Sequence, residues 1–482
     1  MSSTSCAKNK THPKLLTSEN FFLKTVRHPR FFSVLCILTL VTGFVFRLYY
    51  THITVYNITV HDTGGHLNYI KYIVTNKSIP NFDPTTKWCF YNPPFYYVCS
   101  AVVFRFLTGM GFPDAQAWEL FQYFPCIVIF AAVIGMYKIL KEFDIDGLPL
   151  WLATALLSFH PVLNYLSISI TNDPLSLMLT VWAVYFAVRW YKEPTVKSIV
   201  GVALCVGLGM MTKLTVALIA PPIALLFVVK FFKDKQYISH LKQFGIFSVI
   251  CFPLGLFWSV RNWWLFKTPV TYVQSLTEKS GQYIGGYSNA QRFGLPPFSD
   301  FTRVDSSWSR GTADHNLWSQ TLRTSLFDDN MLKWADAFDE NGVQTLDIGG
   351  TWSKITYTNL ATTLMMVSLV MFVLLTGLTV VALFKAKQVN PLFRGFVAVA
   401  GVLLAGNFVK FCMDYPFTCT IHFRYIVPLL LYGCIGMGMY WSWCKKNWFN
   451  RILLGVVAAG IVMTVVISTV LYVNCLPIPL VA

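Results

Sequence analysis

Charged residues are scarce in this sequence. Asp, Glu, Lys and Arg make up 12% of the 482 residues, whereas 55% of the residues are hydrophobic and 16% are aromatic. A soluble chain of this length needs more polar side chains to cover its surface, so the composition excludes a soluble globular protein. We therefore predict an integral membrane protein whose charged residues lie in the loops between apolar segments.

Acidic residues are the scarcer of the two signs, with 22 Asp and Glu against 38 Lys and Arg and a formal net charge of +16. Such an excess indicates nucleic-acid binding when the basic side chains line one face. Here they form short clusters at the ends of apolar runs, where basic residues set the orientation in a membrane. No nucleic-acid partner is predicted.

Two further features are missing from the sequence. The twelve cysteines include no CxxC pair and no metal-ligand spacing, so no disulfide framework is predicted. No internal repeat is evident, which disfavours a transporter built from inverted repeats.

Residues 1–30 are polar and basic, and the apolar run that follows ends at Arg47 without a small-residue cleavage site. We expect this run to be retained as the first span.

Eleven apolar runs approach the roughly 20 residues that a transmembrane helix needs. Another stretch, 95–104, is about half that length, follows a Pro-Pro pair and runs into Arg105. If it does not cross, all the basic loop clusters fall on the same side as the basic N-terminus, as the positive-inside rule requires. We therefore interpret 95–110 as an interfacial or re-entrant helix. The predicted spans are 31–49, 120–137, 148–168, 174–190, 198–212, 214–232, 244–265, 359–384, 395–413, 423–443 and 452–473.

The predicted fold is thus all-α and integral to the membrane, with about eleven transmembrane helices, a cytosolic N-terminus and an external C-terminus. Residues 1–30 form the cytosolic N-terminus, and 31–265 form an N-terminal transmembrane module with the catalytic residues. This module includes an external first loop, 50–117, that carries interfacial helices. A large external loop, 266–358, precedes the C-terminal transmembrane helices of 359–482. Loops this long are usually functional, although 266–358 also fits an extracellular loop without a role in catalysis.

The first external loop contains a candidate functional acid. A helix that starts near Thr63 places Leu67, Ile70 and Val74 on one face, the spacing of an amphipathic helix that lies on a membrane. Asp62 then stands at the start of this helix, near the membrane boundary. Asp is also a favoured N-cap residue, so an ordinary helix cap is the alternative reading.

Three other charged residues, Asp173, Lys213 and Arg424, fall at external span ends in this topology, on the same membrane face as Asp62. An acid at the mouth of a span is often functional. Two carboxylates with two cations suit a reaction on a lipid phosphate, because an acid takes a proton while the cations hold the phosphate leaving group.

The order of these features resembles the GT-C fold glycosyltransferases that use polyprenyl-phosphate sugars, closest to the protein O-mannosyltransferases and the ArnT-like lipid A aminoarabinose transferases. The resemblance runs over nearly the whole chain, although each motif is short. The matching pieces are Asp62 with its amphipathic helix, the Pro-Pro-aromatic segment Tyr91–Tyr97, the pair Asn172 and Asp173, the stretch Gly207–Lys213 and the stretch Arg424–Pro428.

The resemblance implies an inverting, single-displacement transfer of a sugar from a dolichyl- or undecaprenyl-phosphate donor. The acceptor would be a hydroxyl of a protein, a glycan or a lipid on the external or luminal face. Asp62 would be the general base, Asp173 would position the acceptor or the sugar, and Lys213 and Arg424 would contact the phosphate. Substrate or phosphate contacts are implied as well for His66, Tyr91, Asn92, Asn172 and Tyr425.

Two positions depart from the family pattern. Many relatives have a second acidic residue where this chain has Thr63, and a Lys or His where this chain has Asn92. Asn92 carries no charge, which puts phosphate binding there in doubt and leaves room for a different donor. The alternatives are a transporter or flippase of lipid-linked sugars, which should carry charges near mid-span, and a lipid-linked glycan polymerase.

No cofactor is firmly predicted. His61 and His66 flank Asp62, so a divalent cation is the alternative there, but the helical His-x-x-x-His pair of many metal sites is missing. We predict a multi-pass membrane protein of the endoplasmic reticulum in a eukaryote, or of the inner cell membrane in a bacterium.

Overall fold

The computed structural model describes residues 30–56, 62–304, 315–327, 354–445 and 447–474. Over these ranges the regular structure is helical, and the one β contact is an isolated bridge between Tyr283 and Phe417. The predicted all-α fold is therefore confirmed for the described residues. The loop segments 305–314 and 328–353, which fall in the predicted external loop 266–358, lie outside them.

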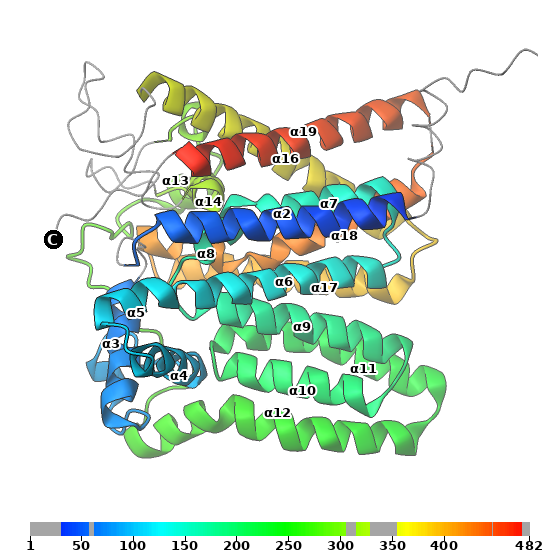
Figure 1. Ribbon diagram of the computed structural model, residues 1–482. Coiled ribbons are helices and arrows are strands. Elements are labelled where there is room, and N and C mark those ends of the chain that lie inside the picture. The colour runs from blue at the N-terminus through cyan, green and yellow to red at the C-terminus, as the bar shows by residue number, and fades with distance from the viewer. Residues whose placement is uncertain (1–29, 57–61, 305–314, 328–353, 446, 475–482) are drawn as a thin grey trace, which may run out of the picture.

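A bundle of long helices that run roughly parallel or antiparallel forms the body of the protein (Figure 1). Although the bounds differ by several residues, each predicted span overlaps one of these helices. They are α2 (Phe31–Ile53), α6 (Tyr123–Glu142), α7 (Gly147–Phe159), α9 (Asp173–Lys192), α10 (Val196–Met210), α11 (Ala220–Asp234), α12 (Tyr237–Phe266), α16 (Lys354–Lys385), α17 (Pro391–Asp414), α18 (Pro428–Trp443) and α19 (Trp448–Asn474).

Seven helical segments among the described residues are long and apolar enough to cross a membrane. The other four predicted spans, 148–168, 174–190, 198–212 and 423–443, correspond to α7, α9, α10 and α18, which are outside that set. The structure thus supports an integral membrane protein, while the number of eleven spans stays a prediction. Many large apolar side chains, such as those of Val249, Val402 and Val45, are exposed on the outside of the bundle, as contact with lipid requires.

Predicted spans 148–168, 214–232 and 423–443 are not continuous α-helices; the last starts as a 3-10 helix, η6 (Phe423–Tyr425), and continues from Pro428 as α18. Span 148–168 is divided into α7 and α8 (Pro161–Leu166), because His160 is extended and Pro161 opens the second helix; a residue that precedes proline disfavours the helical conformation. The buried guanidinium of Arg47 donates to the carbonyls of Leu157 (3.3 Å) and Ser158 (2.6 Å), which the end of α7 leaves without helical partners. Span 214–232 starts as the 3-10 helix η2 (Leu214–Ile219) and continues as α11.

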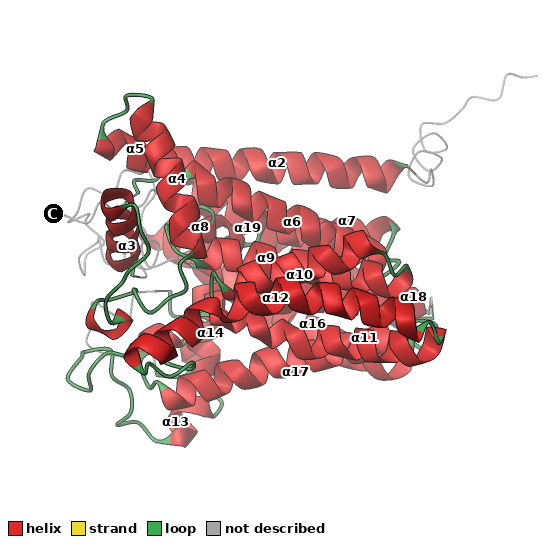
Figure 2. Ribbon diagram, turned by 90° about the horizontal axis from the view of Figure 1, so that it is seen from below, coloured by secondary structure: helices red, strands yellow, loops and turns green. Residues whose placement is uncertain are grey.

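Short helices gather at one end of the bundle, at the left of Figure 1. Among them, α3 lies across the ends of the long helices and packs against α4 (Figures 1 and 2). The predicted helix near Thr63 and the short helix at 95–110 are therefore both present as helices. This group comprises α3 (Thr63–Asn76), α4 (Phe95–Gly109), α5 (Asp114–Phe121), α13 (Asn289–Phe293), α14 (Leu317–Leu326) and the 3-10 helices η1 (Pro84–Thr86), η3 (Phe298–Phe301), η5 (Thr418–Thr420) and η6 (Phe423–Tyr425).

The opposite end of the bundle carries the basic clusters. Basic residues close α6, α9, α11 and α16 there, in the last turns that hold Lys141, Lys192, Lys233 and Lys385. The chain enters α2 at this end and leaves α19 at the other (Figure 1). The basic clusters therefore share one end of the bundle, the arrangement on which the predicted topology rests.

Candidate active site

Asp62 immediately precedes α3 and has a left-handed backbone conformation, with φ +63° and ψ 13°. Asp tolerates this conformation better than most residues, but it remains uncommon outside glycine. The side chain makes no capping hydrogen bond to α3. Its Oδ1 instead accepts a hydrogen bond of 3.0 Å from the indole Nε1 of Trp88. The carboxylate of Asp62 therefore does not cap α3, the alternative that the sequence left open, and is bound by Trp88 instead.

Gly65 allows Trp88 to approach this close. A Cβ atom at position 65 would lie 2.7 Å from Cδ1 of Trp88 and 2.6 Å from Sγ of Cys89, closer than real side chains come. The first turn of α3 can lie against the 88–89 segment only because this residue has no side chain. Trp88 was not among the predicted site residues, since its contact with Asp62 joins positions 26 residues apart.

A second carboxylate, that of Asp173, stands at the first residue of α9 and is almost fully buried, with 7% of its side chain exposed. Lys213 forms an ion pair and hydrogen bond with its Oδ1. Arg424, whose side chain is 6% exposed, places Nη1 3.7 Å from Oδ2 of Asp173 and Nη2 3.8 Å from Oδ2 of Asp62. The structure thus brings together all four charged residues that the sequence placed on one membrane face.

Asp62 differs from Asp173 in its access to solvent. Its side chain is 41% exposed, against 7% for Asp173. Because a buried charge costs free energy unless it is paired, the two cations are essential partners of Asp173. Asp62 keeps an accessible carboxylate beside one of the same cations, Arg424.

Tyr425 packs against both cations. Its hydroxyl accepts a hydrogen bond of 2.9 Å from Nη2 of Arg424, and Nζ of Lys213 lies 5.0 Å from the centroid of its ring. The backbone of Arg424 is fixed in η6, where its N–H donates to Nδ1 of His422 at 3.1 Å. The aromatic face therefore holds the ammonium and guanidinium groups next to one another.

Asn92 and Asn172 form a buried contact between three segments of the chain. The side-chain amide of Asn172 donates to Oδ1 of Asn92 (3.2 Å) and to the carbonyl oxygen of Thr212 (3.1 Å), directly before Lys213. The amide of Asn92 donates to the carbonyl of Cys89 (3.0 Å). These bonds join the start of α9 to the Pro-Pro segment and to the link between α10 and η2. In the structure both residues position their neighbours, and their predicted contact with substrate stays a prediction.

His66 and Tyr91 lie in the wall around the charged cluster. Nδ1 of His66 lies 2.8 Å from the hydroxyl of Tyr97. Burial lowers the pKa of His66 to about 4 although Asp62 and Asp173 act in the opposite direction, so the imidazole is neutral at physiological pH. The carbonyl of Tyr91 accepts a hydrogen bond of 3.0 Å from Nε1 of Trp258, which fixes the segment before Asn92 to α12.

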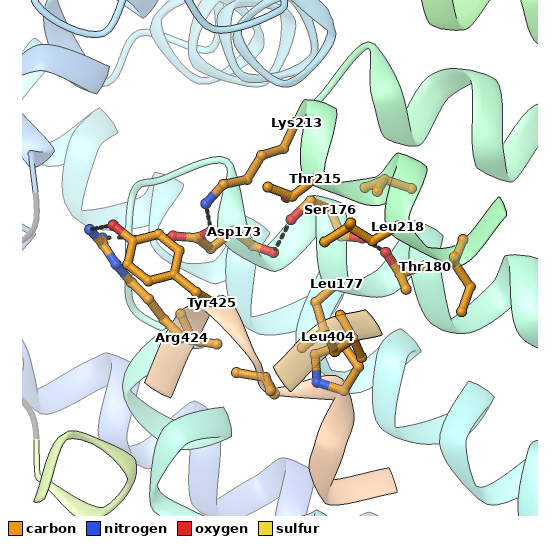
Figure 3. A pocket seen from close by; sticks show the side chains of 15 residues that line it. Asp173, Ser176, Leu177, Thr180, Lys213, Thr215, Leu218, Leu404, Arg424 and Tyr425 are labelled. Atoms are coloured by element: carbon orange, nitrogen blue, oxygen red, sulfur yellow. Dashed lines mark hydrogen bonds and ion pairs between the residues drawn. The ribbon is translucent and has the colours of Figure 1, made fainter. Parts of the chain in front are cut away.

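A pocket extends from the charged cluster between α9, η2, α17 and the start of α18 (Figure 3). Asp173, Lys213 and Arg424 line its polar end, and Ser176 donates a hydrogen bond of 2.9 Å to the backbone carbonyl of Asp173 there. Most of the remainder is lined by apolar side chains, among them Leu177, Leu218, Leu404 and Val427, together with Thr180 and Thr215. A charged end joined to an apolar wall suits an amphipathic ligand with an anionic head.

Residues 115–260 match the family of dolichyl-phosphate-mannose-protein mannosyltransferases. The predicted resemblance to glycosyltransferases of this type is confirmed over that segment, which includes Asp173 and Lys213. Asp62 and Arg424 fall outside it. No curated protein sequence matches the chain significantly.

Three solved structures are similar over most of this chain. The oligosaccharyltransferase of Archaeoglobus fulgidus, in a complex with zinc and sulfate, is 14% identical over 91% of this chain and 53% of its own length, with a TM-score of 0.47. ArnT from Cupriavidus metallidurans, bound to undecaprenyl phosphate, is 14% identical over 91% and 77%, with a TM-score of 0.39. The archaeal oligosaccharyltransferase AglB from A. fulgidus, with an inhibitory peptide and a dolichol-phosphate, is 13% identical over 92% and 56%, with a TM-score of 0.41. This chain thus spans about half the length of the archaeal enzymes.

Among the residues that the structure describes, no three His, Cys, Asp or Glu side chains are placed to hold a metal ion. His61, the partner of His66 in the alternative metal site, is outside the described ranges. The structure therefore does not test the prediction for metal, in which no cofactor is firmly expected and a divalent cation is the alternative.

Proposed function

We propose that this protein is a membrane glycosyltransferase that moves a sugar from a polyprenyl-phosphate donor to an acceptor hydroxyl on the external or luminal face. The observation that carries the proposal is the convergence of Asp62, Asp173, Lys213 and Arg424. Three of them, Asp173, Lys213 and Arg424, line the polar end of a pocket whose other lining is mostly apolar. The family match over 115–260 agrees with a lipid-linked donor, since the proteins of that family are described as acting on dolichyl-phosphate-mannose.

Lys213 and Arg424 would bind the phosphate of the donor. Both line the polar end of the pocket, and guanidinium and ammonium groups are the usual partners of phosphate oxygens. The apolar wall of Leu177, Leu218 and Leu404 would contact the first isoprene units of the lipid. The donor would then lie with its sugar toward Asp62 and its lipid between the helices.

Asp62 would act as the general base. Its accessible carboxylate takes the proton of the acceptor hydroxyl, whose oxygen forms a bond to the anomeric carbon as the bond from that carbon to the phosphate oxygen breaks. The electron pair of the broken bond leaves on polyprenyl phosphate, which gains one negative charge. Lys213 and Arg424 stabilise this developing charge. Electrostatic stabilisation of the transition state by fixed charges is usually the largest single contribution to catalysis. A single displacement inverts the anomeric configuration.

Asp173 would hold the two cations in place. It contacts both of them and is buried beneath them, so in this role it acts on the phosphate through Lys213 and Arg424. This differs from the role implied by the family resemblance, in which Asp173 positions the acceptor or the sugar.

The test uses the purified protein in proteoliposomes with a panel of labelled polyprenyl-phosphate monosaccharides and a membrane extract as the acceptor source. We expect one donor to lose its sugar to an acceptor, with release of polyprenyl phosphate and an inverted anomeric centre in the product. Movement of intact donors across the bilayer without bond cleavage would instead support the flippase alternative. Transfer with retention of configuration would exclude Asp62 as the base of a single displacement.

A further inference from the structure

The carboxylate of Asp62 has a different environment on each side. Its Oδ2 faces Arg424 at 3.8 Å, and Arg424 lines the pocket between α9 and α18. Its Oδ1 accepts the hydrogen bond from Trp88, which lines a separate hollow. A base in a transfer reaction needs the donor on one side and the acceptor hydroxyl within hydrogen-bond reach on the other. The first pocket would hold the donor, so the acceptor would bind in the second hollow.

This hollow lies between the outer face of α3 and the segment 87–90. It has a volume of 360 Å³ and is lined by Asn68, Tyr72, Lys87, Trp88 and Phe90. The rings of Tyr72 and Phe90 are nearly perpendicular, with centroids 5.8 Å apart; Tyr72 is partly exposed and Phe90 is buried. Nζ of Lys87 lies 5.8 Å from the centroid of Phe90.

The lining combines exposed aromatic surface with polar groups that donate and accept hydrogen bonds. Trp88 is 37% exposed although its Nε1 is engaged by Asp62, so part of its ring is open to a ligand. Asn68 is exposed on the same side and offers an amide, and Lys87 is exposed and offers an ammonium group. A pyranose ring has apolar C–H faces that stack on an aromatic ring and hydroxyls around its edge that bond to such groups. The hollow is therefore suited to a saccharide.

We propose that this hollow is the acceptor site, that the acceptor is a saccharide, and that Trp88 is a positioning residue for the base. The proposal rests on the proposed function, because it needs Asp62 to be the base. Trp88 would contact the acceptor through its open ring and orient Asp62 through Nε1, which bonds to one lone pair of Oδ1 and leaves the other to take the proton on the side of the hollow. Asn68 and Lys87 would bind hydroxyls of the saccharide and have no contact with the donor.

The first experiment measures transfer to methyl glycosides, short oligosaccharides and Ser/Thr peptides by the protein in proteoliposomes. We expect saccharides to be accepted. The variants Asn68→Ala and Lys87→Met should raise the KM for the saccharide acceptor about tenfold, a loss of roughly 1.4 kcal/mol of binding free energy in each case, and leave the KM for the donor unchanged. Lys71→Met is the matched control, because Lys71 is exposed on α3 and outside the hollow; its KM values should equal those of the unaltered protein.

The variant Trp88→Phe separates positioning from packing. It keeps an aromatic ring but removes the N–H that bonds to Asp62, so we expect kcat to fall by at least tenfold while the KM for the donor stays the same. A merely structural role for Trp88 would lower the amount of folded protein and leave kcat, measured per folded molecule, unchanged.

Several outcomes would overturn the inference. Exclusive use of peptide acceptors contradicts a saccharide site, and a rise in the KM for the donor in Asn68→Ala would assign the hollow to the donor sugar. If the unaltered protein transfers nothing, binding of labelled oligosaccharides to it in nanodiscs decides the matter. Binding that Asn68→Ala weakens supports a saccharide site even though the proposed transfer fails, whereas no binding rejects both.

Discussion

Replacement of Asp173 by Asn should destabilise the protein and make its stability depend on a phosphate ligand. Asp173 is the only carboxylate in contact with both Lys213 and Arg424 among the described residues. At an effective dielectric constant of about 20, two unit charges about 3.7 Å apart attract each other by roughly 4 kcal/mol before desolvation is subtracted. Removal of one partner from a buried ion pair costs about 3–5 kcal/mol, because the other charge stays buried and unpaired.

We therefore expect Asp173→Asn to lower the melting temperature of the detergent-solubilised protein by roughly 3–10 °C. A matched control is Asp414→Asn, which breaks the ion pair of Asp414 with Lys410 on the surface, where the two side chains are 47% and 73% exposed. Exposed pairs contribute about 0–1 kcal/mol, so the control should shift the melting temperature by no more than about 2 °C.

Polyprenyl phosphate should restore most of the stability lost in Asp173→Asn, because its phosphate would take the place of the missing carboxylate between Lys213 and Arg424. The increase in melting temperature on addition of the lipid should be larger in the variant than in the unaltered protein. The assay is a thermal-shift titration with polyprenyl phosphate, with uncharged polyprenol as the comparison. An equal increase in both proteins, or an equal effect of polyprenol, would refute the assignment of the two cations as the phosphate site.

Three more changes test separate parts of the site. Gly65→Ala should push Trp88 away from Asp62 and reduce transfer at least tenfold, whereas Gly64→Ala, with nothing within 4 Å of its added Cβ, should leave the rate unchanged; equal rates would show that the close approach is dispensable. Lys213→Met should raise the KM for the donor at least tenfold without changing the KM for the acceptor, and the opposite pattern would assign Lys213 to the acceptor. Burial lowers the pKa of His66 to about 4. Between about pH 6.5 and 4 the unfolded chain therefore binds a proton at this residue that the folded chain does not bind. The free energy of unfolding should fall by up to about 3 kcal/mol as the pH drops through this window. In His66→Gln this contribution should vanish, and an unchanged pH dependence of unfolding would contradict it.

The sequence was sufficient to predict where the helices of the body lie because each one coincides with an apolar run, and seven segments also have the length and hydropathy of a membrane span. The helices α3 and α4, at the end of the bundle that carries Asp62, were predictable as well, α3 from its amphipathic spacing and α4 from its short apolar run after a Pro-Pro pair. The break at His160 was missed in the prediction of span 148–168, although Pro161 is a local signal for it. Hydropathy reads this stretch as continuous because both halves are apolar.

The charged residues of the site were also predictable, since a topology assigned from basic loops puts Asp62, Asp173, Lys213 and Arg424 on one face. Their pairing was not. The double contact of Arg424 with Asp62 and Asp173 depends on how η6 lies against α3 and α9, and no local pattern encodes this. The Trp88 contact depends on the left-handed backbone of Asp62 and on the absence of a side chain at Gly65, so it became visible only in three dimensions.

The rate of single-turnover sugar transfer by Asp62→Asn, measured with bound donor and saturating acceptor, tests the central claim most directly. The substitution keeps the size of the side chain and an acceptor for the Trp88 hydrogen bond but removes the base. The account predicts a rate about 10²–10⁴ times lower than that of the unaltered protein, with donor affinity preserved, while Asp114→Asn, an exposed acid in α5 at the same end of the bundle, keeps the full rate. An undiminished rate in Asp62→Asn would contradict the account, because another group would then have to take the proton of the acceptor.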